Sequence, residues 1–238
     1  MNIDELIPKL KNIAPIELAE DYDNGRIGHV IEGKNDINTI ACALDLTPYV
    51  ATKAAELNVD ALIVHHPPFW NPMHGVCGRN VNLIRPLLVN NINLYVMHTN
   101  YDHADGGIND ILATELKLKN ICKGSLEIVG DLTIPLSEIS KILGCDLRVW
   151  GDVSKIKRLA VAGGSAFDLE LIFEAYNLGA DAYLSSELKH NVYLESPIPC
   201  IEATHYSLES IGMKSLAKRE NWVYIDDFPI MSWISPSL

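Results

Sequence analysis

The chain has 238 residues, of which 48% are hydrophobic and 21% are charged, as is typical of one large globular domain or two packed lobes. Its net charge of −12 at pH 7 disfavours a general electrostatic attraction to nucleic acid or to an anionic membrane. No apolar run approaches membrane-spanning length, and the five cysteines lie far apart without a CxxC pair. We therefore expect a cytoplasmic protein without a disulfide framework.

Helices and strands alternate in the first half of the chain. The patterns predict helices over 4–13, 48–57, 81–89 and 108–116, and strands over 37–46, 61–64 and 94–97. Thr47 and Pro48 are residue types that favour a helix N-cap and a first helical position. Such alternation predicts right-handed crossovers and a mainly parallel sheet.

A second α/β series follows, with a less regular stretch between the two. The patterns predict helices over 135–143 and 168–177, a last helix ending near 219, and strands over 158–162, 182–184, 199–203 and 223–225. The last of these strands is expected to close the sheet of its series. The predicted fold is two packed α/β lobes with mainly parallel sheets, one over residues 1–124 and the other over 125–238.

Metal-binding residue types follow several of the predicted strands. His65 and His66 come directly after the strand over 61–64, Asp102 follows the next strand, and His205 follows a strand of the second lobe. Ligands of open α/β sheets collect at the carboxyl ends of strands, so these side chains could meet in a cleft between the lobes. The alternatives are a surface histidine pair at a loop entrance and an Asp102 that caps the following Asp-Gly-Gly turn.

Glu209 completes this group of candidate ligands. It lies four residues after His205 at the start of a helix, so both side chains share one helix face, although a cap or a surface pair would explain them too. Three imidazoles and two carboxylates suit iron, zinc, manganese, cobalt or nickel. Five donors exceed the needs of one tetrahedral site, and the pattern therefore predicts a dinuclear metal site with a bridging carboxylate.

A glycine turn, Gly163-Gly164-Ser165, precedes the helix over 168–177. Free backbone amides before a helix can bind a phosphate. An ordinary strand-to-helix turn explains the same residues and is the favoured interpretation.

Six short motifs occur in one order along almost the whole chain: ALDLT at 43–47, HHP at 65–67, HTNYD at 98–102, GGS at 163–165, SExxH at 186–190 and HYSxE at 205–209. In this combination the chain resembles the Nif-three-like family (NGG-interacting factor three), whose members are often named type 2 GTP cyclohydrolase I homologues. The segment 23–28 departs from the Trp-Asp-Asn opening that is usual in the family.

The resemblance implies a dinuclear metal site in the cleft of two α/β lobes. It also implies a toroidal homohexamer built as a trimer of dimers. Two divalent ions per chain are expected, iron or zinc before manganese, cobalt or nickel. The implied metal ligands are His65, His66, Asp102, His205 and Glu209.

Glu187 and His190 are candidate catalytic residues. They could act as acid and base, or as partners behind the ligands, since a ligating histidine usually donates its second N–H to an acceptor such as Glu187. His98 could orient a ligand in the same way. His190 could equally be an exposed residue near a helix start.

Three functions remain open from the sequence. The first is a metal-dependent hydrolase that acts on a nucleotide such as GTP. The second is a metal-trafficking protein that supplies iron for assembly of a metallocofactor. The third is a nucleic-acid-binding toroid, which the net charge disfavours.

Overall fold

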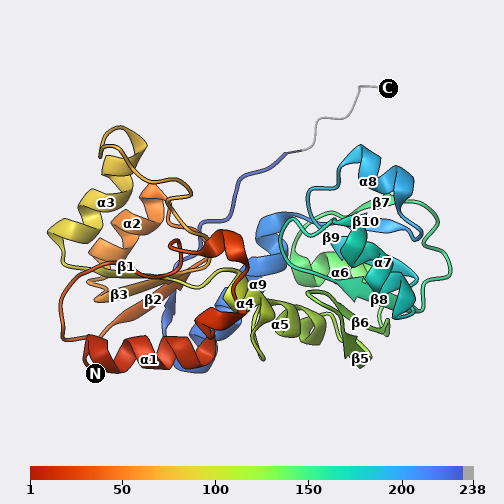
Figure 1. Ribbon diagram of the computed structural model, residues 1–238, viewed down its shortest axis with the longest axis horizontal. Coiled ribbons are helices and arrows are strands. Elements are labelled where there is room, and N and C mark those ends of the chain that lie inside the picture. The colour runs from red at the N-terminus through yellow and green to blue at the C-terminus, as the bar shows by residue number, and fades with distance from the viewer. Residues whose placement is uncertain (233–238) are drawn as a thin grey trace.

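Two β-sheets, each covered by helices, form two lobes in the computed structural model, which describes residues 1–232 (Figure 1). The first sheet has the order β1-β4-β3-β2-β11, formed by Gly28–Ile31, Asn93–Val96, Ala61–Val64, Ile40–Ala43 and Val223–Tyr224. Only β1 in this sheet runs antiparallel to its neighbour. The prediction of a mainly parallel sheet is therefore confirmed for the first lobe.

Alternating side chains of the first sheet pack on two helical layers. Ile40 and Cys42 face one core, whereas Ala41 and Ala43 face the other. The first core includes α1 (Ile3–Ile13) and α9 (His205–Glu220), and the second includes α2 (Pro48–Glu56) and α3 (Arg79–Val89). Thr47 caps α2 as predicted, because its side chain accepts a hydrogen bond from the Val50 N–H.

The second sheet has the order β5-β6-β8-β9-β10-β7, formed by Lys119–Lys123, Ile128–Asp131, Arg158–Val161, Ala182–Ser185, Cys200–Glu202 and Arg148–Trp150. Here the prediction of a mainly parallel sheet is wrong. β8, β9 and β10 are parallel, but β5, β6 and β7 all pair antiparallel. The short connection from β5 to β6 permits only an antiparallel pair, because parallel strands need a long crossover. The other two antiparallel pairs, β6 with β8 and β7 with β10, join strands that are distant in the sequence.

The second sheet is also covered on both faces. Its helices are α5 (Ile108–Glu115) and α6 (Leu136–Leu143) on one face, and α7 (Leu169–Asn177) and α8 (His190–Glu195) on the other. The remaining helix, α4 (Thr99–His103), follows β4 and contacts α5.

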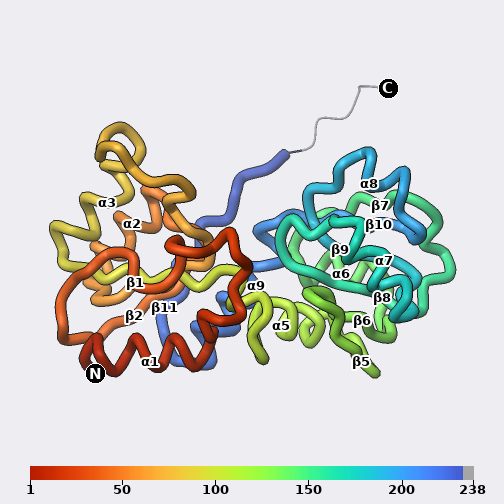
Figure 2. The backbone as a smooth tube through the Cα atoms, in the orientation of Figure 1, coloured from red at the N-terminus to blue at the C-terminus, as the bar shows by residue number. Residues whose placement is uncertain are grey.

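The chain crosses between the lobes more than once, whereas a boundary at residue 124 predicts a single crossing. β5 precedes that boundary but belongs to the second sheet, and β11 pairs with β2 of the first sheet. The strand predicted over 223–225 therefore closes the first sheet, because α9 carries the chain back across the junction (Figure 2). The division into 1–124 and 125–238 stays a prediction about folding units.

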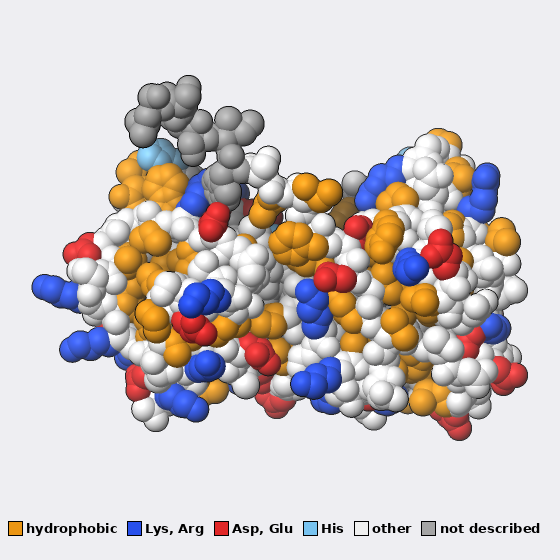
Figure 3. Space-filling view, turned by 180° about the vertical axis from the view of Figure 1, so that it is seen from behind, with side chains coloured by type: hydrophobic (Ala, Val, Ile, Leu, Met, Phe, Trp, Pro, Cys, Tyr) orange, Lys and Arg blue, Asp and Glu red, His pale blue; other side chains and the backbone are white. Residues whose placement is uncertain are grey.

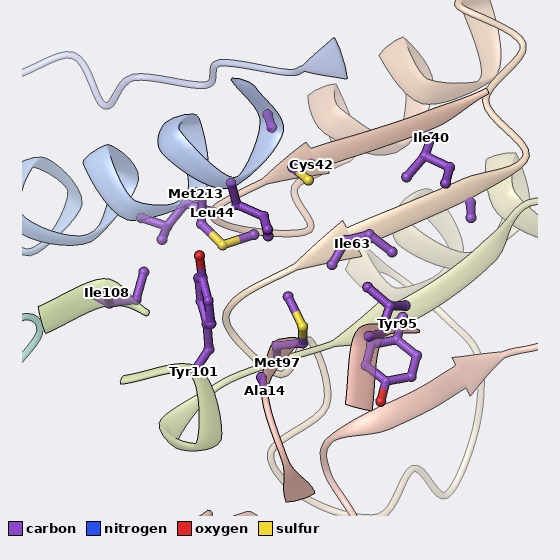
Figure 4. Close-up of a cluster of buried hydrophobic side chains, with 14 of the residues drawn as sticks. Ala14, Ile40, Cys42, Leu44, Ile63, Tyr95, Met97, Tyr101, Ile108 and Met213 are labelled. Carbon is purple, nitrogen blue, oxygen red and sulfur yellow. The ribbon is translucent and has the colours of Figure 1, made fainter. Parts of the chain in front are cut away.

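Helix α9 is buried in both lobes. Leu208 packs in the core of the second lobe, whereas Met213 packs in the first, beside Tyr101 and Met97 (Figure 4). Gly212 permits this position, because a Cβ there would lie 2.5 Å from Ile108 Cδ1 and 3.1 Å from Ile108 Cα. The close approach of α5 and α9 thus depends on a residue without a side chain.

The cysteines and the longest apolar helices bear on two expectations from composition. All five cysteines carry free thiols, although only Cys42 and Cys200 are buried. Within residues 1–232, no helix combines the length and apolarity needed to cross a membrane.

Gly212→Val should lower the free energy of unfolding by about 1–3 kcal/mol, because the added methyl groups must displace the fully buried Ile108. Urea unfolding followed by circular dichroism measures this loss. Lys218→Val places the same side chain on an exposed position of the same helix and should change the stability by less than about 1 kcal/mol. Equal stabilities of the two variants would contradict a packing role for Gly212.

Candidate metal centre

The side chains predicted as metal ligands, His65, His66, Asp102, His205 and Glu209, lie together at the junction of the lobes. Glu209 Oε2 is 2.9 Å from His205 Nε2 and 3.0 Å from His66 Nε2. His65 Nε2 is 3.5 Å from Asp102 Oδ1 and 3.7 Å from Glu209 Oε1. The structure therefore brings together all five residues in one cluster, with donors from both ends of the sequence.

Local structure explains how each element presents its donor. The backbone N–H groups of His65 and His66 both donate to the Leu44 carbonyl, which extends the β2–β3 pairing past the end of the strand. His205 and Glu209 lie in the first turns of α9, where Thr204 is the N-cap and accepts from the Ser207 N–H. The spacing of four residues places both side chains on one helix face, as predicted.

The histidines at this site share one hydrogen-bonding pattern. Each Nδ1 lies against an oxygen acceptor, at 2.7–2.8 Å; the pairs are His65 with Met97 O, His66 with Asp45, His98 with Asp23, and His205 with Glu187. An Nδ1–H that donates to oxygen leaves Nε2 as the free donor atom, which is the tautomer of a metal ligand. The acceptors thus orient the rings so that Nε2 can bind a cation.

Two donor atoms in the cluster lack a partner of their own. Among the described residues, His65 Nε2 and Asp102 Oδ1 are buried without a hydrogen bond, whereas Glu209 Oε2 lies between the imidazoles of His66 and His205. His66 Nε2 and His205 Nε2 face each other at 3.2 Å, and the Glu209 carboxylate lies within 3.0 Å of both. Burial of unpaired polar atoms is costly, so these residues fit bound metal ions.

Two overlapping groups could each hold an ion. One comprises His65, Asp102 and Glu209, and the other comprises His66, His205 and Glu209. The ligand atoms within each group lie within 4.8 Å of one another. Nitrogen and oxygen donors of this kind suit iron, zinc, manganese, cobalt or nickel.

Burial and neighbouring charges shift the pKa values of these residues in opposite directions. Burial lowers the pKa of His65 to about 4. Burial also acts to lower the pKa of His66, but hydrogen bonds to Asp45 and Glu209 outweigh it and raise the value to about 10. Against the same burial effect, Glu209 raises the pKa of His205 to about 9. Burial, reinforced by Glu209, raises the pKa of Asp102 well above its ordinary value.

His98 and Asp23 extend the site beyond the predicted ligands. His98 forms a third group of possible ligands with His65 and His66, within the same 4.8 Å limit. Asp23 is fully buried and accepts hydrogen bonds from His98 Nδ1 and from the Thr99 N–H, at 2.8 and 3.1 Å. The sequence motifs predict an orienting role for His98, but they give no signal for Asp23, because its segment has only the composition of a polar turn.

Glu187 and His190, the two candidate catalytic residues, occupy different places. Glu187 accepts from His205 Nδ1, on the side of the ring away from Nε2, and its backbone has a φ of 61° in the left-handed region. This geometry supports a positioning role rather than acid–base chemistry. His190 is exposed at the start of α8, where its ring lies beside Tyr193, and the structure does not bring it into the cluster.

The glycine turn at 163–165 also contacts the centre. Gly164 has a φ of 68°, and a Cβ on it would lie 2.5 Å from Glu209 Oε1. The Gly163 N–H already donates to Asn109 Oδ1 at 2.7 Å. The turn therefore makes room for the Glu209 carboxylate, which agrees with the favoured interpretation of an ordinary strand-to-helix turn.

Two cavities open on the cluster and share His66 and His205 as wall residues. One, of about 580 Å³, lies between Tyr22, Trp70 and the glycine turn. The other, of about 690 Å³, has mainly apolar walls that include Leu44, Tyr206 and the segment 227–231. A ligand could reach the donor atoms from either side.

Comparisons with known proteins identify one family over most of the chain. The model of the Duf34/NIF3 (NGG1p interacting factor 3) family matches residues 1–224. A relative from Methanocaldococcus jannaschii, named GTP cyclohydrolase 1 type 2 homolog, is 32% identical over 232 residues, which cover 90% of this chain and 92% of the relative. These matches confirm the resemblance read from the motifs.

Solved structures have the same fold. Reduced HcgD from Methanocaldococcus jannaschii is 28% identical, with a TM-score of 0.79 over 94% of this chain and 96% of that chain. TTHA1606 from Thermus thermophilus is 28% identical, with a TM-score of 0.82 over 97% of this chain and 100% of that chain. The two-lobed architecture is therefore shared along essentially the full chain.

Metal affinity should rise with pH between pH 7 and about pH 9. His66 and His205, with pKa values of about 10 and about 9, are protonated without a bound metal and must lose these protons to ligate. Competition with a chromophoric chelator across this pH range measures the affinity. A histidine with an ordinary pKa near 6.5 would give a plateau above pH 7, so a flat profile would contradict the raised pKa values.

Glu187→Ala should weaken metal binding by about 10- to 100-fold, because His205 loses the acceptor that orients its ring. Equilibrium dialysis with metal quantification measures the change. Glu195→Ala removes an exposed glutamate from α8 and should have no effect. If Glu187→Ala kept full metal affinity and lost only turnover, Glu187 would be an acid–base residue instead.

Proposed function

This chain belongs to the Duf34/NIF3 (NGG1p interacting factor 3) family, and we propose that it is a metal-dependent hydrolase with a dinuclear centre that acts on a nucleotide-like substrate. The observation that carries the proposal is the set of imidazole Nε2 atoms directed at two buried carboxylates, those of Asp102 and Glu209. Glu209 is common to both groups of donors and would bridge two ions. Iron or zinc is expected first, and manganese, cobalt or nickel would also suit these donors.

The chemistry divides between the ions and the protein. Two divalent ions, when bound, would lower the pKa of water to about 7 and orient an electrophile beside it. The imidazoles are held in one orientation by hydrogen bonds to Asp45, Asp23 and Glu187. Solvent is largely excluded from Glu209, whose exposed fraction is 3%. The name of the Methanocaldococcus jannaschii relative supports a purine nucleotide as the substrate class.

Glu209→Gln tests the proposal directly. A neutral amide replaces an anionic bridging oxygen poorly, so the variant should stay folded, lose at least one ion per chain and lose hydrolysis. Metal is quantified by mass spectrometry after anaerobic purification, and hydrolysis by a screen of nucleotides and nucleosides for products whose combined mass exceeds that of the substrate by one water.

Lys218→Gln, at the exposed end of the same helix, is the matched control and should keep both metal and activity. Two ions retained in Glu209→Gln at wild-type affinity would remove Glu209 from the ligand set. A metal-loaded wild-type protein that produced no hydrolysis product would count against the hydrolase.

A metal-trafficking protein is the second candidate, and one observation favours it. The two donor groups differ in exposure: the side chain of His65 is fully buried, whereas those of His66 and His205 are 18% and 31% exposed. An ion held by His66 and His205 would therefore exchange more readily. A chelator time course that removed one ion quickly and the other slowly, in a protein without turnover, would support this function.

The surface charge gives little support to nucleic-acid binding. On the face shown in Figure 3, Lys and Arg side chains alternate with Asp and Glu. Arg158, Lys214 and Arg219 form ion pairs with Asp131, Asp226 and Glu220. The homohexamer stays a prediction, which light scattering can test.

A further inference from the structure

Two aromatic side chains line the 580 Å³ cavity beside the metal donors. Tyr22 and Trp70 are 54% and 45% exposed, so their rings are accessible to a ligand in this cavity. The two rings reach the cavity from different segments, one before β1 and one after β3. Exposed rings at the wall of a concave site are suited to contact with a flat ligand.

Neighbouring residues fix the position of these rings. Arg26 Nε donates to the Trp70 carbonyl at 2.8 Å, and its guanidinium lies 5.6 Å from the centre of the Trp70 ring. The His98 ring is nearly perpendicular to Trp70 at 5.5 Å and lies 6.3 Å from Tyr22.

The same imidazole connects these rings with the metal donors. The His98 ring centre lies 5.1 Å from that of His65 and 5.5 Å from that of His66. A flat ligand held against Trp70 would therefore lie next to the reactive end of the cleft.

The negative charge of the cavity wall disfavours a negatively charged ligand. Its wall includes the carboxylates of Glu20, Asp102, Asp168, Glu170 and Glu209, and none of the described residues that line it is Lys or Arg. Two divalent ions would offset much of this charge but leave the outer wall, with Asp168 and Glu170, acidic. The Glu209 carboxylate lies against Gly164 of the glycine turn, so a phosphate bound at this turn would meet another negative charge.

We propose that this cleft binds a flat, uncharged nitrogen heterocycle of the nucleobase or nucleoside class, held by Trp70 and Tyr22, and that it discriminates against a triphosphate chain. This inference rests on the proposed hydrolase for its chemistry and narrows the substrate from a nucleotide to its uncharged part. The acidic wall repels phosphates, whereas a neutral ring meets only the aromatic contacts.

Calorimetric titration of the zinc-loaded protein tests the inference without turnover. The probes are guanosine, adenosine and cytidine, with GTP as the charged counterpart of guanosine. Guanosine should bind at least about tenfold more tightly than GTP, because the acidic wall repels the added phosphates. Trp70→Leu should weaken nucleoside binding by about tenfold or more, whereas Trp70→Phe, which keeps an aromatic face, should retain most of it.

A double variant, Asp168→Asn with Glu170→Gln, tests the electrostatic part. Asn is as good an N-cap as Asp, so α7 should stay folded after the change. GTP affinity should rise by about tenfold in this variant because two negative charges leave the wall. Glu195→Gln, on α8 outside the cleft, is the control and should leave GTP affinity unchanged.

Three results would overturn the inference: no binding of any of the three nucleosides, GTP binding as tight as that of guanosine, or equal affinities in Trp70→Leu and Trp70→Phe. The proposed hydrolase is judged separately, by product formation. Nucleoside binding without a product would support the inference and contradict the hydrolase. Hydrolysis of another substrate without nucleoside binding would do the reverse.

Discussion

The carboxylate of Glu209 is the point on which both the fold and the site depend. It is 3% exposed and lies within 3.7 Å of the Nε2 atoms of His65, His66 and His205. A buried carboxylate without partners costs several kcal/mol, so these imidazoles or bound cations must compensate its charge. His65 and His66 come from the first lobe, whereas His205 and Glu209 lie on α9, which is buried in both lobes, so the same compensation joins the lobes and forms the candidate metal centre.

The burial of Glu209 explains why two positions are glycine, although their local sequence suggests only an ordinary turn and an ordinary helix. Gly164 leaves the space that the Glu209 carboxylate fills, and Gly212 lets α9 approach α5 at the level of Ile108. Small residues thus set the depth at which α9 lies, and that depth keeps Glu209 away from water. The packing of α9 therefore determines how deeply Glu209 is buried, and with it the electrostatics of the site.

The cleft combines two kinds of wall around one set of donor atoms. One side is acidic and aromatic, whereas the other is mainly apolar and includes the segment 227–231. Such a site can separate a polar reacting group from an apolar or aromatic remainder, which is how specificity usually arises in ligand pockets. Carboxylates accept hydrogen bonds from the Nδ1 atoms of three of the histidines. Their negative charge makes the Nε2 atoms better donors to a divalent cation.

The sequence by itself determined most of the local structure and the candidate ligand set. Hydrophobic periodicity located the longer helices and the parallel strands but not α4 and α8. The strand ends, together with the spacing of His205 and Glu209, predicted the five residues that cluster. Only the tertiary structure decided that Asp23 is buried behind His98, that β11 joins the first sheet and that β5 to β7 run antiparallel. Local hydrophobic patterns indicate which side chains are buried. Strand order and the partner of Asp23 depend instead on which distant segments pack together, and the residue spacing within one segment does not specify this.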